Sequence, residues 1–259
     1  MRINRPLRIS PSSINTFLKC SMQFKWRYID ELEPDEETDN LYAPRGITFH
    51  KLMQLNDLYS LDEKKLKNYW EVVFLSYVSD CSNLPKDLSY DSFLKSGDLL
   101  IENGLNLKKR WEDAEIIENE DYIRLEYKNK FIDNLFLSGR LDLVLLKDDD
   151  YIVLDWKTSK SIEKNIGENL QIGLYIYFIH KKYKIDYENI FGALAYPFSK
   201  KILFTQRDEN SIQEIFNKID KMLERLSNSD FKKEPKENWN LDNCYFCPYI
   251  KNCDKRNDD

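Results

Sequence analysis

The spacing of apolar residues changes once along the chain. Up to about residue 117, apolar residues recur three or four positions apart, which predicts amphipathic helices. The first helix is expected to begin with Ser10, a preferred N-cap residue, followed by Pro11 in the first helical position. Further helices are expected from Gly46 to about residue 55, at 62–80 and at 90–117, with an acidic surface loop at 30–40.

Beyond residue 121 the apolar residues alternate with polar ones or form short runs, which predicts strands. Strands are expected at 122–127, 135–146, 151–158, 190–196 and 202–205, and helices at 169–182 and 210–226. This order predicts a mixed α/β (α+β) fold, with a core sheet flanked by helices in a single domain over 1–259. Its expected parts are a mainly helical part at 1–117, the core at 118–230 and a cysteine-rich segment at 231–259.

Two of the predicted strands form a hairpin that brings charged residues together. If the acidic segment between them is a four-residue loop, Leu146 pairs with Tyr151, and counting back puts Asp142 opposite Asp155. Lys157 follows Asp155 by two positions and therefore shares its face. Opposed residues on one face lie roughly 5 Å apart. The pattern thus places two carboxylates and one amine on one patch of the sheet.

This patch has the chemistry of a metal site. Adjacent carboxylates repel each other unless a cation lies between them, and oxygen ligands suit Mg²⁺ or Mn²⁺. Such an ion can polarise a phosphodiester and activate water, while Lys157 positions the water or stabilises charge on the phosphate. The hairpin alone is equally compatible with an ordinary polar sheet face. The apolar neighbours of Asp142 and Asp155 favour the metal site, because single acids in such strands are costly unless paired.

The composition narrows the class of protein. A hydrophobic fraction of 42% excludes a disordered chain. The chain has only 7 glycines and no G-x-G-x-x-G or P-loop motif, which argues against a nucleotide-binding loop. The net charge of −6 argues against a protein that coats nucleic acid, although a channel beside acidic metal ligands can still be basic. Without a signal-peptide pattern or an apolar run that could span a membrane, we expect an intracellular, cytoplasmic protein (host cytoplasm if viral) without disulfides.

The charged hairpin resembles the core of the PD-(D/E)XK nucleases in their RecB-like form. The matching motifs are G-R-L-D at 139–142, D-W-K at 155–157, Q-x-x-x-Y at 171–175 and G-x-x-x-H at 46–50. The resemblance implies a restriction-endonuclease-like core and a metal bound by His50, Asp142, Asp155 and the main-chain carbonyl of Trp156. It also implies a catalytic set, which consists of Asp142, Asp155, Lys157, Gln171 and Tyr175.

The flanking residues agree with this resemblance without proving it. Gln171 and Tyr175 are four positions apart and share a helical face, where they can hold a phosphate or steady the lysine. By themselves they are equally typical of any helix, and an isolated His50 is typical of a structural histidine. Glu126 on the preceding strand is a further candidate ligand, although a solvent-facing strand residue is the preferred interpretation.

Three cysteines near the end of the sequence form the pattern C-x₂-C-x₅-C, at Cys244, Cys247 and Cys253. Three thiolates leave a tetrahedral site one ligand short, and Cys20 can supply the fourth. This set resembles RecB-like nucleases with an iron–sulfur staple, such as the nuclease domain of AddB and CRISPR-associated exonucleases, and so implies a [4Fe–4S] cluster. By spacing alone, a Cys₄ zinc site or buried thiols are alternatives. Cys81 fits no pattern.

The favoured function is a Mg²⁺- or Mn²⁺-dependent DNA exonuclease that acts on single strands or free ends. The resemblance implies a role in recombination, viral replication or CRISPR adaptation, with protein partners in such a complex and no membrane. A DNA-binding or scaffold module and a structure-specific endonuclease are the alternatives. Aromatic residues can stack on bases, although the core is the preferred place for each. They are Trp156, Tyr175, Tyr177 and Tyr245.

Overall fold

A computed structural model describes residues 6–34, 42–55, 61–77, 90–232, 244 and 247–255. The chain divides into two compact units that interleave along the sequence. The first unit consists of Met1–Thr38, Ile123–Gly139 and Asn210–Asp259, and the second of Asp39–Tyr122 and Arg140–Glu209. The expectation of a single domain over 1–259 therefore stays a prediction.

The strands form a mixed sheet, which confirms the α/β class. They are β1 (Leu7–Ile9), β2 (Glu115–Glu126), β3 (Leu135–Lys147), β4 (Asp150–Trp156), β5 (Ile190–Tyr196) and β6 (Lys201–Gln206). In the second unit the strand order is β3-β4-β5-β6, with β4 and β5 parallel and the other pairs antiparallel. In the first unit β1 pairs in parallel with the beginning of β3. Strand β2 also pairs with β3, outside the main order.

The β3–β4 hairpin has the predicted register but a shorter turn. Leu146 pairs with Tyr151 as expected, and Lys147 also pairs with Asp150, so only two residues form the turn. Asp148 and Asp149 both have positive φ, at 51° and 69°. Two left-handed residues in succession are typical of a type I′ turn, whose twist matches that of the strands. The expected four-residue loop was therefore wrong, while the pairing that it served to predict is correct.

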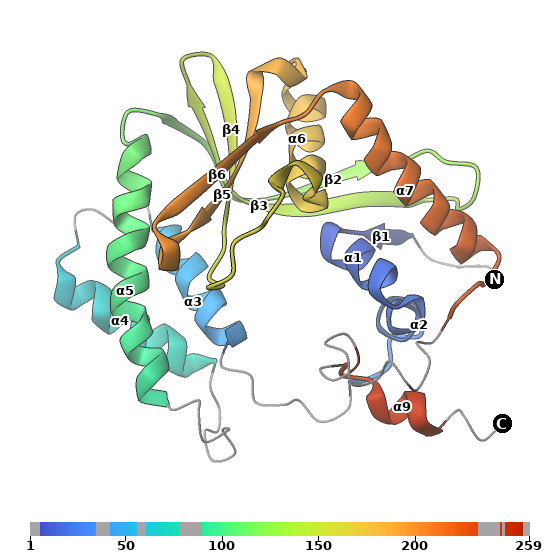
Figure 1. Cartoon of the computed structure of the whole chain (residues 1–259), viewed down its shortest axis with the longest axis horizontal. Coiled ribbons are helices and arrows are strands. Elements are labelled where there is room, and N and C mark those ends of the chain that lie inside the picture. The colour runs from blue at the N-terminus through green and yellow to red at the C-terminus, as the bar shows by residue number, and fades with distance from the viewer. Residues whose placement is uncertain are drawn as a thin grey trace. The chain divides into compact units, whose positions relative to one another are not determined.

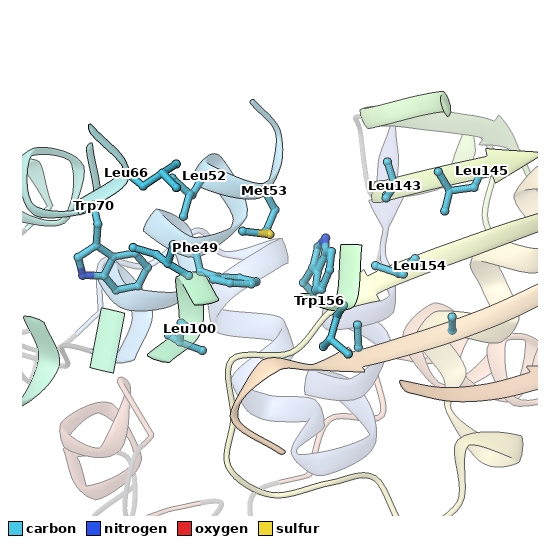
Figure 2. Close-up of a cluster of buried hydrophobic side chains, with 14 of the residues drawn as sticks. Phe49, Leu52, Met53, Leu66, Trp70, Leu100, Leu143, Leu145, Leu154 and Trp156 are labelled. Atoms are coloured by element: carbon cyan, nitrogen blue, oxygen red, sulfur yellow. The ribbon is translucent and has the colours of Figure 1, made fainter. Parts of the chain in front are cut away.

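Three helices of the second unit lie on one side of this sheet and share a hydrophobic core with it (Figure 1). They are α3 (Tyr42–Met53), α4 (Glu63–Ser76) and α5 (Tyr90–Lys108), and α4 packs on the other two. Figure 2 shows Phe49 of α3 facing Trp156 at the end of β4, and their rings are 5.7 Å apart in an edge-to-face contact. Leu154 of β4 lies in the same cluster because side chains two positions apart share a face. This core fixes the end of β4.

The opposite face of the sheet is covered by α6 (Leu170–Tyr183), which begins at the N-cap residue Asn169. The helix lies so close to β5 that a Cβ atom at Gly192 would come within 2.2 Å of Ile172 Cγ2. A glycine is required here by this close approach. In register, Asp155 of β4 lies beside Leu194 of β5, two positions from Gly192, so Asp155 points toward α6.

The first unit carries the remaining helices. They are α1 (Pro11–Lys19), α2 (Ser21–Phe24), a π-helical turn (Lys25–Ile29), α7 (Glu209–Ser227, whose first residue belongs to the second unit) and α9 (Ile250–Lys255). As predicted, Ser10 caps α1 and Pro11 occupies its first turn; Ser10 and Ser13 form a reciprocal capping box.

Two expected element boundaries need correction, and one strand was missed. The helix predicted at 90–117 ends at Lys108 and is followed by a short 3₁₀ turn, and residues from Glu115 onward already belong to β2. Helix α3 begins at Tyr42 rather than at Gly46. The short strand β1 was not predicted at all, because three residues are too few to show a period. No helix among the described residues is both long and apolar enough to cross a membrane.

Candidate active site

The end of the hairpin places two buried carboxylates beside a lysine. The exposed fraction is 2% for Asp155 and 9% for Asp142. Lys157 Nζ lies 2.7 Å from Asp155 Oδ2, in the arrangement expected for two residues on the same side of a strand. Buried carboxylates are costly unless a cation or hydrogen bonds compensate them. One cation, the Lys157 ammonium, is already part of the site.

Asp142 interrupts the pairing of β3 with β4. The backbone pairs end at Leu143 and Leu154, and beyond them the Trp156 N–H donates to Asp142 Oδ2 at 2.7 Å. The N–H and C=O of one strand residue point to the same side. The carbonyl of Trp156 therefore points toward the Asp142 side, while the next N–H, of Lys157, donates to Ala195 of β5. This orientation agrees with a carbonyl ligand at position 156.

A third acid joins this group. Potential ligand atoms of His50, Glu120 and Asp142 all lie within 4.8 Å of one another. His50 Nδ1 is 3.2 Å from Asp142 Oδ1 and 3.9 Å from Glu120 Oε1. Glu120 also faces Arg140, whose Nη1 is 3.5 Å from Glu120 Oε2. The structure thus brings His50 and Asp142 together as the sequence suggested, and adds Glu120.

Glu120 reaches the site through an unusual backbone conformation. Its φ is 56°, although it lies inside strand β2 and is not a glycine. Left-handed residues within strands occur where a bulge redirects a side chain, and such strain gathers at functional sites. Nothing in the sequence pattern singled it out, because Glu118, Glu120 and Asp121 look alike in a polar stretch. Glu126, the acid considered from the sequence, is exposed on the same strand.

Helix α6 supplies a hydrogen-bond network around the lysine. Lys157 Nζ donates to Gln171 Oε1 at 2.8 Å, and Gln171 Nε2 donates to Asp155 Oδ1 at 2.7 Å. The same amide lies 2.9 Å from the Tyr175 hydroxyl oxygen, to which it also donates. The two helix residues share a face, as their spacing predicted. They hold the Asp155–Lys157 pair from the α6 side.

Burial and mutual repulsion set the protonation of these groups. Burial, reinforced by the charge of Asp142, raises the pKa of Asp155 to about 6. Burial alone would lower the pKa of His50, but its hydrogen bond to Asp142 and the neighbouring acids outweigh it, so the pKa is raised. Burial, followed by the charge of Asp142, also raises the pKa of Glu120. A divalent cation at this site would therefore have to compete with protons for these carboxylates.

The four cysteines of the predicted staple lie in the first unit. Cys20 ends α1 and caps α2, where its Sγ accepts from the Gln23 N–H at 3.4 Å. Cys247 N–H donates to the Cys244 carbonyl at 3.0 Å, and Cys253 lies in α9. Burial raises the pKa of Cys247 to about 11, and the nearby thiols of Cys20, Cys253 and Cys244 add to the shift. Cys20, Cys244 and Cys253 therefore lie near Cys247, although in the described part of the chain no three of these Sγ atoms lie within 4.8 Å of one another.

A small core includes two of these thiols. Trp26, Tyr249 and Cys253 are buried together, with Cys247 packed against them. The Tyr249 hydroxyl donates to the Leu32 carbonyl at 3.3 Å, which links the two ends of the chain within the first unit. Cys81 lies outside the described residues, as does Tyr245.

The aromatic residues near the hairpin are mostly part of the core. Trp156 is 3% exposed and packs on Phe49, and Tyr175 is 4% exposed. Neither offers a ring face to a base in this structure, in keeping with the preferred interpretation from the sequence. Tyr177 is half-buried.

Comparison with known proteins assigns this arrangement to a family. One solved structure, "Crystal structure of SSO0001", is similar at 14% sequence identity over 96% of this chain and 86% of that chain, with a TM-score of 0.39. No curated protein matches the chain. The family model described as the PD-(D/E)XK nuclease superfamily matches residues 8–254, which include every residue of the site described above. The chain therefore belongs to the PD-(D/E)XK nuclease superfamily.

Proposed function

We propose that the protein is a Mg²⁺- or Mn²⁺-dependent DNA nuclease of the RecB-like form that degrades single strands or DNA from free ends. The observation that carries this proposal is the meeting of the His50, Glu120 and Asp142 ligand atoms beside the buried Asp155–Lys157 pair. Family membership supports nuclease chemistry in general. The exonuclease action and the choice of DNA are our inference.

The donor set fits a hard divalent cation. Carboxylate oxygens with one imidazole suit Mn²⁺ and Mg²⁺ better than the softer metals that thiolates select. We assign the ion to His50, Asp142, Asp155 and the Trp156 carbonyl, and add Glu120 as a further ligand. When bound, such an ion polarises the phosphodiester and lowers the pKa of a water molecule.

Lys157 acts as a fixed positive charge in this proposal. Burial alone would lower its pKa, but the charge and hydrogen bond of Asp155 and the charge of Asp142 together outweigh burial, so the pKa is raised and the ammonium persists at neutral pH. Its bonds to Asp155 and Gln171 leave little freedom to rotate. A preorganised cation stabilises the charge that develops on a phosphate in the transition state. We therefore assign Lys157 to charge stabilisation, and Gln171 and Tyr175 to positioning it.

The direct test is cleavage of end-labelled DNA with Mn²⁺. We expect wild type to degrade linear single strands, Asp155→Asn to lose activity by about 10³-fold because a carboxylate ligand is lost, and circular single strands to survive. Asp150→Asn, at the other end of strand β4, is the matched control and should cleave like wild type. Binding of DNA without any cleavage by wild type would instead favour the scaffold alternative. Cutting of circles would favour an endonuclease.

A separate test concerns Glu120. In a calorimetric Mn²⁺ titration, Glu120→Gln should weaken binding by about tenfold, because one anionic ligand becomes neutral. Glu126→Gln changes the same residue type on the same strand at an exposed position and should bind like wild type. Equal affinities for Glu120→Gln and wild type would remove Glu120 from the ligand set.

We also propose that Cys20, Cys244, Cys247 and Cys253 bind a [4Fe–4S] cluster. Support comes from the C-x₂-C-x₅-C spacing and from the position of Cys247, which lies near enough to the other three thiols for their charges to influence it. Protein purified without oxygen should be brown, with absorbance near 400 nm and about four iron atoms per chain. A colourless preparation that contains zinc would assign the site to the Cys₄ zinc alternative.

A further inference from the structure

A cavity of 970 Å³ opens in the second unit beside the residues that follow strand β4. Helix α5 lines it with one face, since Ser92, Ser96 and Leu99 recur at helical spacing. The segment after β4 contributes Thr158 to Ser161, α3 contributes Arg45, and the short turn after β5 contributes Phe198. The lining residues include three basic side chains and several hydroxyls, and none of them is acidic.

Arg45 is a fixed positive charge in the cavity wall. It is only 6% exposed, and its Nη2 donates to the Thr158 carbonyl at 2.8 Å. Its guanidinium lies over two aromatic rings, 5.2 Å from the Phe93 centroid and 4.9 Å from the Phe198 centroid. Stacking on two rings holds a guanidinium in place and leaves it charged. The cation is therefore in position before any ligand arrives.

Lys95 and Lys160 add two mobile charges at the same cavity. Both side chains are exposed, and Lys160 Nζ lies 5.9 Å from the Phe198 centroid. Within the ranges that the structure describes, no carboxylate forms a salt bridge with either lysine. Two flexible ammonium groups and one fixed guanidinium form a donor set that matches the oxygens of a phosphate. The hydroxyls of Ser96 and Ser159 already donate to backbone carbonyls of their own segments, so the cationic groups supply the binding.

The cavity shares two elements with the candidate active site. Helix α3 carries Arg45 and, five residues later, His50, which is a separation of about 7.5 Å along the helix. The chain that carries Asp155 and Lys157 continues directly into the cavity wall at Thr158. A Cβ atom at Gly46 would lie 3.3 Å from Thr158 Oγ1, so the two elements touch where the cavity meets the site.

We propose that this cavity binds a phosphate group of the nucleic-acid strand, within one or two nucleotides of the bond that is cut. The inference rests on the proposed nuclease function. It adds a binding site for one phosphate, which positions the nucleic-acid strand relative to the bond that is cut. A phosphate in the cavity lies next to the chain that bears Lys157, so a neighbouring phosphodiester reaches the carboxylates. The cavity thereby contributes to binding of the strand rather than to bond breakage.

The test compares two charge-neutralised double variants of the full chain. Lys95→Gln/Lys160→Gln alters the cavity, whereas Lys181→Gln/Lys184→Gln removes the same charge from exposed positions at the far end of α6. Binding of a labelled single-stranded oligonucleotide is measured in EDTA at several salt concentrations. We expect the cavity variant to bind about tenfold more weakly, with the slope of log K against log salt reduced by about 0.7 for each phosphate that the variant no longer neutralises. The control should change less than threefold.

Cleavage kinetics with Mn²⁺ supply a second measurement. The cavity variant should raise KM by about tenfold and leave kcat within twofold, because it loses binding that is equal in ground and transition states. A loss confined to 5′-phosphorylated strands identifies the ligand as a terminal phosphate, and an equal loss on unphosphorylated strands identifies an internal one.

The inference is overturned if the cavity variant, with an unchanged melting temperature, matches the control in both affinity and salt slope. That result is distinct from failure of the proposed function, in which wild type itself cuts no DNA with Mn²⁺.

Discussion

The two clusters of reactive side chains in this protein differ in what holds them together. His50, Asp142 and Asp155 are carried by a helix and two strands, over a core of 15 buried residues. The cysteines lie at the ends of short helices and turns, and their small core has 3 buried residues in the described part of the chain. The comparison indicates that the first cluster is arranged by the fold, without any bound ion. The second is expected to depend on ligation for its own stability.

Loss of one cysteine tests this contrast most strongly. Cys247→Ser is expected to abolish the absorbance near 400 nm and to lower the free energy of unfolding by up to about 5 kcal/mol, because a cluster closes the loop from Cys20 to Cys244. Denaturant unfolding of wild type and variant, both prepared without oxygen, measures the difference. Removal of Mg²⁺ with EDTA serves as the comparison and should lower the free energy of unfolding far less. A variant as stable as wild type would show that the cysteines are not a staple.

The core beneath the first cluster should carry its stability instead. Phe49 is fully buried and packs on Trp156, so Phe49→Ala is expected to lower the free energy of unfolding by about 4 kcal/mol, because packing is weakened and a cavity remains. Val72→Ala on α4, where the side chain is 67% exposed, should change it by less than about 0.5 kcal/mol. Thermal unfolding of both variants measures the difference in stability. If Phe49→Ala melts like Val72→Ala, the core does not organise the site.

The next effect concerns activity rather than stability. Gln171→Ala removes the amide that bonds both Lys157 and Asp155, and kcat is expected to fall by about 10- to 100-fold because the lysine loses its orientation. Gln213→Ala, at an exposed position of α7, is the control. Steady-state kinetics with Mn²⁺ measure both variants. Unchanged kcat for Gln171→Ala would mean that Asp155 alone positions the lysine.

The smallest predicted effect is a dependence of metal affinity on pH. The pKa of Asp155 is raised to about 6 and that of His50 is also raised, so both hold protons in the metal-free protein as the pH falls. A metal must displace those protons, so Mn²⁺ affinity should fall as the pH decreases, first through protonation of His50, whose pKa is raised above its usual value, and further below about pH 6 through protonation of Asp155. Calorimetry at pH 5.5 and pH 7.5, in two buffers of different ionisation enthalpy, counts the protons. Affinity that is constant over this range would contradict the prediction.

The sequence was most informative where a strict period governs the chain. The pattern of residues along β3 and β4 was enough to predict that Leu146 pairs with Tyr151. This pairing predicts that Asp142 and Asp155 lie opposite each other at the same end of the hairpin. The spacing of Gln171 and Tyr175 likewise placed both on one helical face. In each case backbone geometry alone sets the direction of the side chain. Such directions are therefore predictable without any knowledge of tertiary packing.

The sequence was least informative where tertiary packing decides the conformation. The left-handed backbone of Glu120 has no local cause in its neighbours, so the polar stretch around it did not single it out. The cavity beside Thr158 was missed for a similar reason. Arg45 and Lys95 lie on different helices, and the spacing of apolar residues predicts each helix but not how the two helices pack together. The early end of α5 before Glu115 also depends on pairing with a strand distant in sequence.

The bond between the Trp156 N–H and Asp142 has a consequence for how this chain can evolve. Asp142 takes the place of a backbone acceptor where β3 and β4 separate, and an uncompensated buried N–H costs about 1–3 kcal/mol. A descendant that has lost its activity still needs an acceptor there, and asparagine supplies one without the charge. Inactive homologues should therefore keep asparagine at position 142 more often than alanine or leucine. A position first selected for catalysis would then remain polar because the fold needs its acceptor.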